Sequence, residues 1–288
     1  MRRHHAAALG TLLVFGLTAC GDSSDPPIDV TLNGPGHGTL ASPDVVSAHA
    51  ADVLVSVYST GGSGEPGTRV PDAEVRTDGT VFLNGEDGLG VDTFTLTPDG
   101  LTRVREAFRT VAFGKHDYER SEWTDQPVTS VFTTLGGRPE AVSVYGLGHD
   151  EDVDDHEWDR LLDAIAELDD LAETAAVRTD GDIATGRASY RPEQVGLVLT
   201  DNGEVEDASI DWPLSRPLAE YDQGSTGLGD PCIVVTGSDV VTLEALRDED
   251  LDDRAWSSGT TSVDVDVRPI LRGETGPCTP AAPETPVG

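Results

Sequence analysis

The sequence predicts an α+β fold in which a mostly antiparallel or mixed sheet carries two or three amphipathic helices and one disulfide. Short runs rich in β-branched residues alternate with glycine-containing turns, a pattern typical of β-hairpins. Other segments place apolar residues three or four positions apart, which is the spacing of a helix with one buried face. Packing such helices on one face of a sheet is a standard way to bury both apolar surfaces.

The first predicted elements are strands. Val53–Tyr58 is rich in valine and favours an extended strand. Arg69–Arg76 and Val81–Leu83 flank Asp78-Gly79, which predicts a two-residue hairpin turn because glycine accepts positive φ. Asp92–Leu96 is expected to be the next strand.

A helix is predicted directly after this strand. Thr97 suits the N-cap, Pro98 the first helical position and Asp99 the positive end of the helix. The residues that follow supply an apolar stripe at helical spacing, namely Leu101, Val104, Phe108 and Val111.

A second hairpin and two more helices complete the pattern. Val128–Leu135 and Ala141–Leu147 flank a glycine-rich turn, and a helix with one apolar and one acidic face is expected over Asp154–Leu171. A third helix begins at Ser238 or Asp239. The remaining expected strands are Val195–Thr200, Cys232–Val235 and Ser262–Leu271.

The N-terminus carries the pattern of an export signal. Met1-Arg2-Arg3 is cationic, and Ala6–Ala19 is apolar, uncharged and too short for a permanent membrane helix. The segment Leu17-Thr18-Ala19-Cys20 resembles the lipobox of bacterial lipoproteins. This resemblance implies that Cys20 receives a diacylglycerol thioether and becomes the mature N-terminus. A buried first helix and an ordinary secretory signal are the alternatives.

These features divide the chain into four parts. Residues 1–19 are the expected lipoprotein signal peptide, and residues 20–51 form a polar tether rich in Gly and Pro. Residues 52–278 form the α+β body, and residues 279–288 form a disordered Pro/Ala-rich tail. The expected location is the extracytoplasmic side of the cell membrane, with the lipid, of which palmitate is the typical acyl chain, as the anchor.

Lipidation of Cys20 leaves two of the three cysteines. In an exported protein an even pair is expected to oxidise, so Cys232 and Cys278 are predicted to form a disulfide. The alternative, a metal-binding or catalytic thiol pair, lacks a third cysteine or a neighbouring histidine.

The chain carries 53 acidic and 19 basic residues, a net charge of −34. Such a surface repels nucleic acid, which is therefore not an expected partner. The membrane is expected as a partner only through the N-terminal lipid, and the protein or small-molecule partner stays open. No cofactor is expected, apart from a weak indication of calcium.

The indication of calcium comes from an acidic segment. Its candidate ligands are His149, Asp150, Asp152, Asp154 and His156. Three aspartates at alternate positions suit a hard cation, but Asp155 and Leu161 stand where a calcium loop needs Gly and Glu. The alternative is a solvated acidic loop at the positive end of a helix.

Catalytic motifs are not apparent. The chain contains no G-x-S-x-G motif, and Ser238 and Asp239 are ordinary residues for a helix start. We therefore expect no catalytic residues.

From about residue 52 to residue 278 the chain resembles a group of secreted actinobacterial lipoproteins that has no known activity. The resemblance is carried by the lipobox, Val142–Leu147, Asp211–Leu214, Cys232 with Val235–Gly237, and Trp256 with Arg268–Leu271 before Cys278. It implies a location but no catalytic residues. The leading expectation is a non-enzymatic binding or interaction module of the cell envelope. The alternatives are an extracytoplasmic hydrolase that uses carboxylates and a solute-binding lipoprotein.

Overall fold

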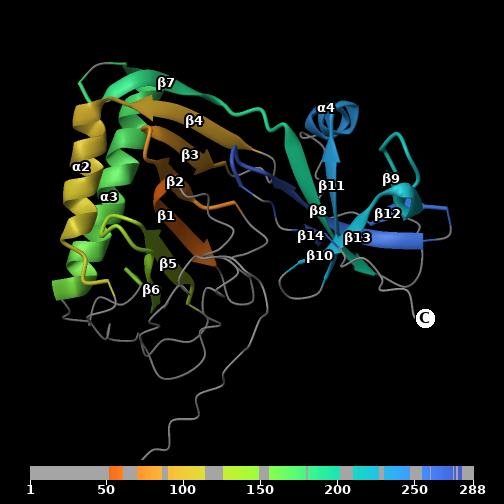
Figure 1. Ribbon diagram of the computed structural model, residues 1–288, viewed down its shortest axis with the longest axis horizontal. Helices are drawn as coiled ribbons and strands as arrows, with labels where there is room; N and C mark the ends of the chain where they lie inside the picture. Colours follow the sequence, from red (N-terminus) through yellow and green to blue (C-terminus); the bar gives the residue numbers. More distant parts are fainter. Residues whose placement is uncertain are drawn as a thin grey trace, which may run out of the picture.

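The computed structural model confirms the α+β class (Figure 1). It describes residues 52–60, 70–85, 90–113, 126–148, 156–179, 181–201, 210–226, 230–246, 255–259, 261–274, 276 and 278–280. Within these residues the chain forms three α-helices, one short 3-10 helix and two seven-stranded sheets. The sequence pattern predicted the class, but it did not show that the strands form two sheets instead of one.

The first sheet has the strand order β6-β5-β1-β2-β3-β4-β7, and all its pairs are antiparallel. Both predicted hairpins lie in it. Its strands are β1 (Val53–Thr60), β2 (Ala73–Arg76), β3 (Thr80–Asn84), β4 (Val91–Leu96), β5 (Val128–Thr133), β6 (Glu140–Tyr145) and β7 (Ile183–Ser189).

The turn between β2 and β3 forms as the sequence predicts. Gly79 adopts φ +89°, a conformation that favours glycine, and Asp78 Oδ1 accepts a hydrogen bond of 2.8 Å from the backbone N–H of Thr80. This turn sets the register in which Val75 faces Val81 across the hairpin. Both valines then point toward the helices and join the core.

Two helices, α2 (Pro98–Arg109) and α3 (His156–Val177), lie side by side over one face of this sheet (Figure 1). Thr97 caps α2 as expected, because its hydroxyl accepts a hydrogen bond from Gly100 N. Helix α3 ends six residues beyond the expected Leu171, since Ala172 and Ala175 prolong its buried stripe.

Arg103 of α2 holds these elements together. Its guanidinium pairs with Glu167 and Asp170 of α3, and with Asp182, which lies just before β7. These three carboxylates hydrogen-bond to the guanidinium and raise the pKa of Arg103, with Asp170 contributing most. The pairs are partly exposed, so they orient the helices more than they stabilise the fold.

The second sheet has the order β14-β10-β11-β8-β13-β12-β9. The pair β9–β12 is parallel and the other pairs are antiparallel. Helix α4 (Ser238–Ala245) packs beside β11 and has its own core with this sheet. The strands are β8 (Gln194–Asp201), β9 (Ile210–Asp211), β10 (Gln223–Ser225), β11 (Pro231–Thr236), β12 (Trp256–Ser258), β13 (Thr261–Pro269) and β14 (Thr279–Pro280).

The two sheets meet at a small apolar junction. Phe82 of β3 and Leu271, which follows β13, belong to one buried cluster, and Tyr190 packs against it. The rings of Phe82 and Tyr190 meet edge to face at a centroid distance of 5.0 Å. Tyr190 lies in the short connection between β7 and β8, so the crossing from one sheet to the other is itself part of the junction.

Among the described residues, no helix is both long and apolar enough to span a bilayer.

Replacing Gly100 with alanine tests the packing of α2 on the strand connection. A Cβ at Gly100 would collide with the backbone carbonyl of Asp182, which cannot move like a flexible side chain. We expect Gly100→Ala to lower the free energy of unfolding by about 1–3 kcal/mol, as for other overpacked sites. Denaturation by urea measures it. Glu106→Ala, an exposed change in the same helix, is the control and should stay within about 0.5 kcal/mol of wild type.

Candidate functional site

The structure places few of the residues proposed for metal binding. His149, Asp150, Asp152 and Asp154 lie outside the described residues. His156 begins α3 with its side chain 88% exposed, and its Nδ1 lies 3.8 Å from Asp159 Oδ2. Among the described residues no group of three His, Cys, Asp or Glu side chains could hold a metal ion. Calcium binding by the acidic segment stays a prediction.

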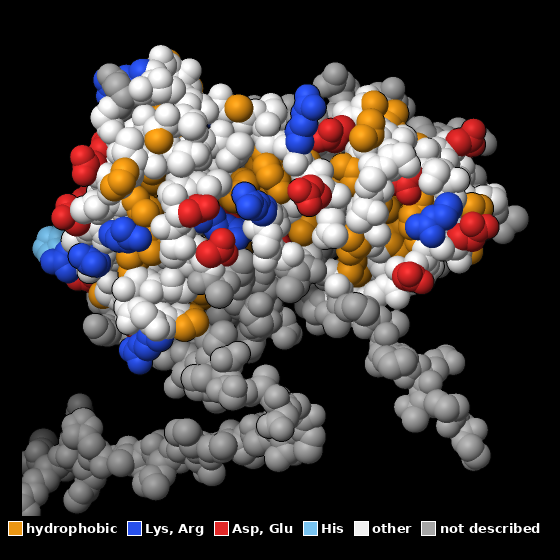
Figure 2. Space-filling view, turned by 45° about the horizontal axis from the view of Figure 1, so that its top comes forward, with side chains coloured by type: hydrophobic (Ala, Val, Ile, Leu, Met, Phe, Trp, Pro, Cys, Tyr) orange, Lys and Arg blue, Asp and Glu red, His pale blue; other side chains and the backbone are white. Residues whose placement is uncertain are grey.

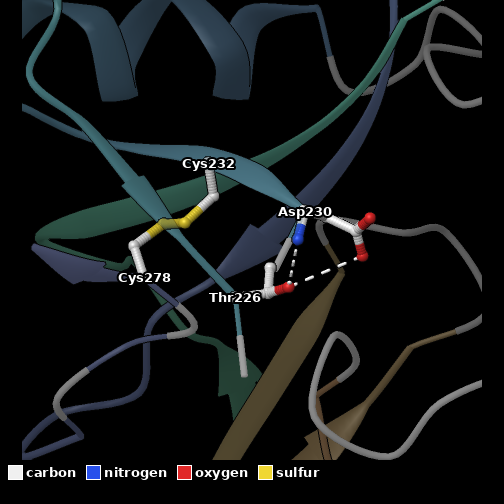
Figure 3. The surroundings of a disulfide bond; sticks show 4 residues. All are labelled: Thr226, Asp230, Cys232 and Cys278. Carbon is white, nitrogen blue, oxygen red and sulfur yellow. Dashed lines mark hydrogen bonds between the residues drawn. A yellow bond between two sulfur atoms is a disulfide. The ribbon is translucent and has the colours of Figure 1, made fainter. Parts of the chain in front are cut away.

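The disulfide between Cys232 and Cys278 is confirmed (Figure 3). Cys232 is buried in β11, and the two Cα atoms lie 5.7 Å apart. Beside the disulfide, the loop between β10 and β11 is closed by Thr226, whose backbone N–H donates to Asp230 O at 2.8 Å and whose hydroxyl accepts from Asp230 N at 3.1 Å. The bridge therefore ties the C-terminal segment to the centre of the second sheet. Cys20 lies outside the described residues.

Among the described residues, a group of buried charges lies at the junction of the two sheets, and we take it as the candidate site. It begins in β2, where the side chains of Glu74 and Arg76 are 0% and 2% exposed. Arg76 Nη2 lies 2.6 Å from Glu74 Oε1, and Arg76 Nη1 donates to Asp52 Oδ1 at 2.7 Å. The same guanidinium lies over the ring of Phe82, 5.5 Å from its centroid.

Burial and charge act in opposite directions on Arg76. Removal from water disfavours the guanidinium charge, but the carboxylates of Glu74 and Asp52 outweigh this effect and raise the pKa of Arg76. The arginine therefore stays charged. Its charge is compensated within the fold, as a buried charge requires.

The second sheet contributes its own buried pair. Arg268, near the end of β13, donates from Nη2 to Glu274 Oε1 at 2.7 Å, and the two side chains are 6% and 2% exposed. The other carboxylate oxygen of Glu274 accepts from Leu271 N at 2.8 Å, and Glu274 N donates to Leu271 O at 3.0 Å. Glu274 thus closes the turn that places Leu271 in the junction.

Tyr58 of β1 connects the two groups of charges. Desolvation by burial raises the pKa of its phenol well above the ordinary value, and Glu74 adds to this effect while Arg268 opposes it. The phenol is therefore close enough to both sheets to feel a charge from each. Burial also raises the pKa of Tyr190. Both phenols stay protonated at neutral pH.

The chemistry open to this cluster is narrow. The Arg76–Glu74 and Arg268–Glu274 pairs bring opposite charges within hydrogen-bonding distance, and Tyr58 is held as a neutral phenol. General acid or base catalysis needs a group with a pKa near the working pH. The geometry instead suits a structural role, in which each sheet compensates the charge that it buries at the junction.

A second polar centre lies at the start of α4. Asp239 is buried, and its carboxylate accepts from Tyr221 Oη at 2.6 Å and from Ser215 N at 3.1 Å. Burial acts to raise the pKa of Asp239, but these hydrogen bonds outweigh it and the pKa is lowered. The carboxylate therefore fastens the loop before β10 to the helix.

The turn from β11 into α4 has the form of a tight elbow. Gly237 takes φ +63° and ψ −125°, a conformation that favours glycine. In hydrolases with a nucleophile elbow, the residue at this strained turn supplies the attacking oxygen. Glycine has no side chain to do so, and the neighbouring Ser238 is the exposed first residue of the helix.

No protein-family model, curated protein or solved structure matches the chain. The interpretation of the site therefore depends on its own residues.

Sequence reasoning missed the buried charges at the junction. Glu74 and Arg76 are two apart in a short strand, so they share a face that the alternation alone assigns to solvent. Arg268 occupies the same kind of position, because Val263, Val265 and Val267 take the core side of β13. A weak signal was present, in that Glu74 and Arg76 of unlike charge alternate with Ala73 and Val75.

The buried pair in the second sheet gives a stability test. Arg268→Met would leave the Glu274 carboxylate buried without its cation, so we expect a loss of about 3–5 kcal/mol in the free energy of unfolding. Adding Glu274→Gln should recover part of this loss, because the buried charge is then removed. Arg138→Ala breaks an exposed pair with Glu140 and should cost less than about 1 kcal/mol. A cost for Arg268→Met as small as that of Arg138→Ala would contradict a structural role for the pair.

Tyr58 gives a pH test. Its pKa in the fold is raised above the ordinary 10.0. Its contribution to stability is therefore fully present below pH 10 and is lost as the pH rises above this value, by up to about 1.4 kcal/mol per pH unit for one proton. We expect Tyr58→Phe to reduce the slope with which the free energy of unfolding falls between pH 9 and 11. Part of the slope should persist, because the pKa of Tyr190 is also raised. An unchanged slope would show that Tyr58 ionises as freely in the fold as in the unfolded chain.

Proposed function

We propose that the protein is a lipid-anchored domain on the extracytoplasmic side of the cell membrane and that it binds a partner rather than catalysing a reaction. The observation that carries the proposal is the disulfide between Cys232 and Cys278. It uses two of the three cysteines of the chain and leaves Cys20, in its lipobox-like setting, for the lipid. Structural disulfides are also typical of proteins outside the cytoplasm.

The polar clusters support a binding role over catalysis. The buried arginines and glutamates at the junction pair with one another. The carboxylate of Asp239 is hydrogen-bonded to Tyr221. The turn at Gly237 offers no nucleophilic side chain. The junction charges and Asp239 therefore each have a partner within the fold, and a structural role explains their burial. The described fold also presents a face on which acidic and basic side chains are interspersed (Figure 2), which suits a binding module.

The two rival functions have less support. A carboxylate-dependent hydrolase needs a pair of acids with different protonation states facing a substrate. The buried acids described here, Glu74, Glu274 and Asp239, each face a cation or hydrogen-bond donor. A solute-binding protein holds its ligand between two lobes, but the described junction is filled by Phe82 and Leu271 together with the ion pairs.

Replacing the proposed lipid attachment residue tests the anchor. We expect Cys20→Ala to move the protein from the membrane fraction to the supernatant and to remove the diacylglycerol mass from the N-terminal peptide. The matched control is the double change Cys232→Ser and Cys278→Ser, which should lower stability but leave the protein on the membrane. Immunoblotting of fractions and mass spectrometry report both. Membrane retention of Cys20→Ala would refute the anchor.

A further inference from the structure

The chain contains two Asp–Pro peptide bonds, and one of them lies in the described fold. Asp25-Pro26 belongs to the expected tether and lies outside the described residues. Asp230-Pro231 leads into β11, and both of its residues are exposed. A bond of this kind is a tertiary amide, and mild acid cuts it more readily than other peptide bonds. The reason is that the aspartate side chain can attack its own backbone carbonyl carbon while the proline nitrogen takes up a proton.

The fold places a hydrogen-bond donor on the carbonyl oxygen of this bond. Thr226 N donates to Asp230 O at 2.8 Å across the loop between β10 and β11. The pairing of Ser225 with Pro231, directly beside the bond, holds the donor and the carbonyl in register. Attack on a carbonyl carbon moves negative charge onto its oxygen, and a positioned N–H stabilises that charge. The folded chain therefore favours attack at this bond.

The carboxylate of Asp230 has no cation to hold it away from its own carbonyl carbon. The ion pairs among the described residues do not include Asp230. Thr226 Oγ1 accepts from Asp230 N at 3.1 Å and donates to Asp230 Oδ2 at 3.5 Å (Figure 3). Strand β10 beside the bond and β14 beyond it carry no titratable side chain. A single hydroxyl thus orients the aspartate without neutralising it.

We propose that the chain cleaves itself at the Asp230–Pro231 peptide bond in mild acid. A carboxylate oxygen of Asp230 bonds to the carbonyl carbon of the same residue and closes a five-membered anhydride ring. The bond from this carbon to the nitrogen of Pro231 breaks, and the nitrogen keeps the electron pair and is protonated from the solvent. One water molecule then opens the anhydride. Asp230 ends with two carboxyl groups, and Pro231 becomes a new amino terminus.

The strand order keeps the two fragments together after the cut. In the order β10-β11-β8-β13, the N-terminal fragment supplies β8 and the C-terminal fragment supplies β11 and β13 on either side of it. Cys232 and Cys278 both lie in the C-terminal fragment, so the disulfide does not link the fragments. The cleaved protein is therefore a pair of chains held by strand pairing and by the core of the second sheet. This inference is independent of the proposed anchor and of partner binding.

Incubation of the folded full chain in a mildly acidic buffer with non-ionic detergent tests the proposal. Mass spectrometry of the new amino termini measures the rate at each Asp–Pro bond. We expect the Asp230–Pro231 bond to be cut at least tenfold faster than Asp25–Pro26, the reference bond in the same chain. In concentrated urea the difference should disappear, because the Thr226 donor is lost. No cleavage, equal rates in the folded chain, or a difference that persists in urea would overturn the proposal.

Electrophoresis distinguishes this cut from a nick by a protease. Residues 231–288 should separate from the remainder under denaturing conditions even without a reductant, but should co-elute with it in native size-exclusion chromatography. A nick between Cys232 and Cys278 would leave its fragments joined by the disulfide. Fragments that separate only after reduction would therefore place the cut inside the disulfide loop and contradict self-cleavage at Asp230–Pro231.

Three variants identify the reacting groups. Asp230→Ala removes the attacking oxygen, and Asp230→Glu keeps the charge but needs a larger ring, so each should slow the cut at least tenfold. Pro231→Ala replaces the tertiary amide and should slow it by a similar factor. Asp222→Ala, at an exposed aspartate just before β10, is the control and should be cut like wild type. Undiminished cleavage in whichever of the three variants circular dichroism shows to be folded would rule out the proposed chemistry.

Discussion

The structure depends on burying charge as pairs where two separate sheets meet. Each sheet has its own helices and its own core, and the apolar contact between them is small. The Arg76–Glu74 pair lies on one side and the Arg268–Glu274 pair on the other, with Tyr58 under the influence of both. Leaving any of these charges unpaired would cost several kcal/mol, so each sheet supplies the partner for the charge that it buries at the junction. The pairs therefore make burial of these charges tolerable, while Phe82, Leu271 and Tyr190 make the apolar contact between the sheets.

The disulfide and the Glu274 turn extend this constraint to the C-terminal end. Glu274 closes the turn after β13 and thereby directs Leu271 into the junction. A few residues later Cys278 is tied to Cys232 in β11. The last described segment is thus held at two points, by a buried carboxylate and by a covalent bond. This arrangement restrains the C-terminal segment against both the junction and β11.

Local signals in the sequence predicted the elements well. The turn at Asp78-Gly79 and the cap at Thr97 depend on residues within a few positions, and both appear as expected. The pairing of Cys232 with Cys278 followed from counting thiols. The division into two sheets did not follow, because alternation along a strand says which residues share a face but not what covers that face. The positions of Arg268 and Glu74 became buried only through contacts made far along the chain, and the acidic segment from His149 to Asp154 lies outside the described residues.

Hydrogen exchange of the native chain measures most directly whether the junction with its buried pairs joins the two sheets into one unit. The account predicts that the slowest amides of β1, in the first sheet, and of β8, in the second, exchange with the same opening free energy in the wild-type protein. In Arg268→Met the two values should separate. Different opening free energies for β1 and β8 in the wild type, unchanged by Arg268→Met, would show that the sheets unfold independently and would contradict the account.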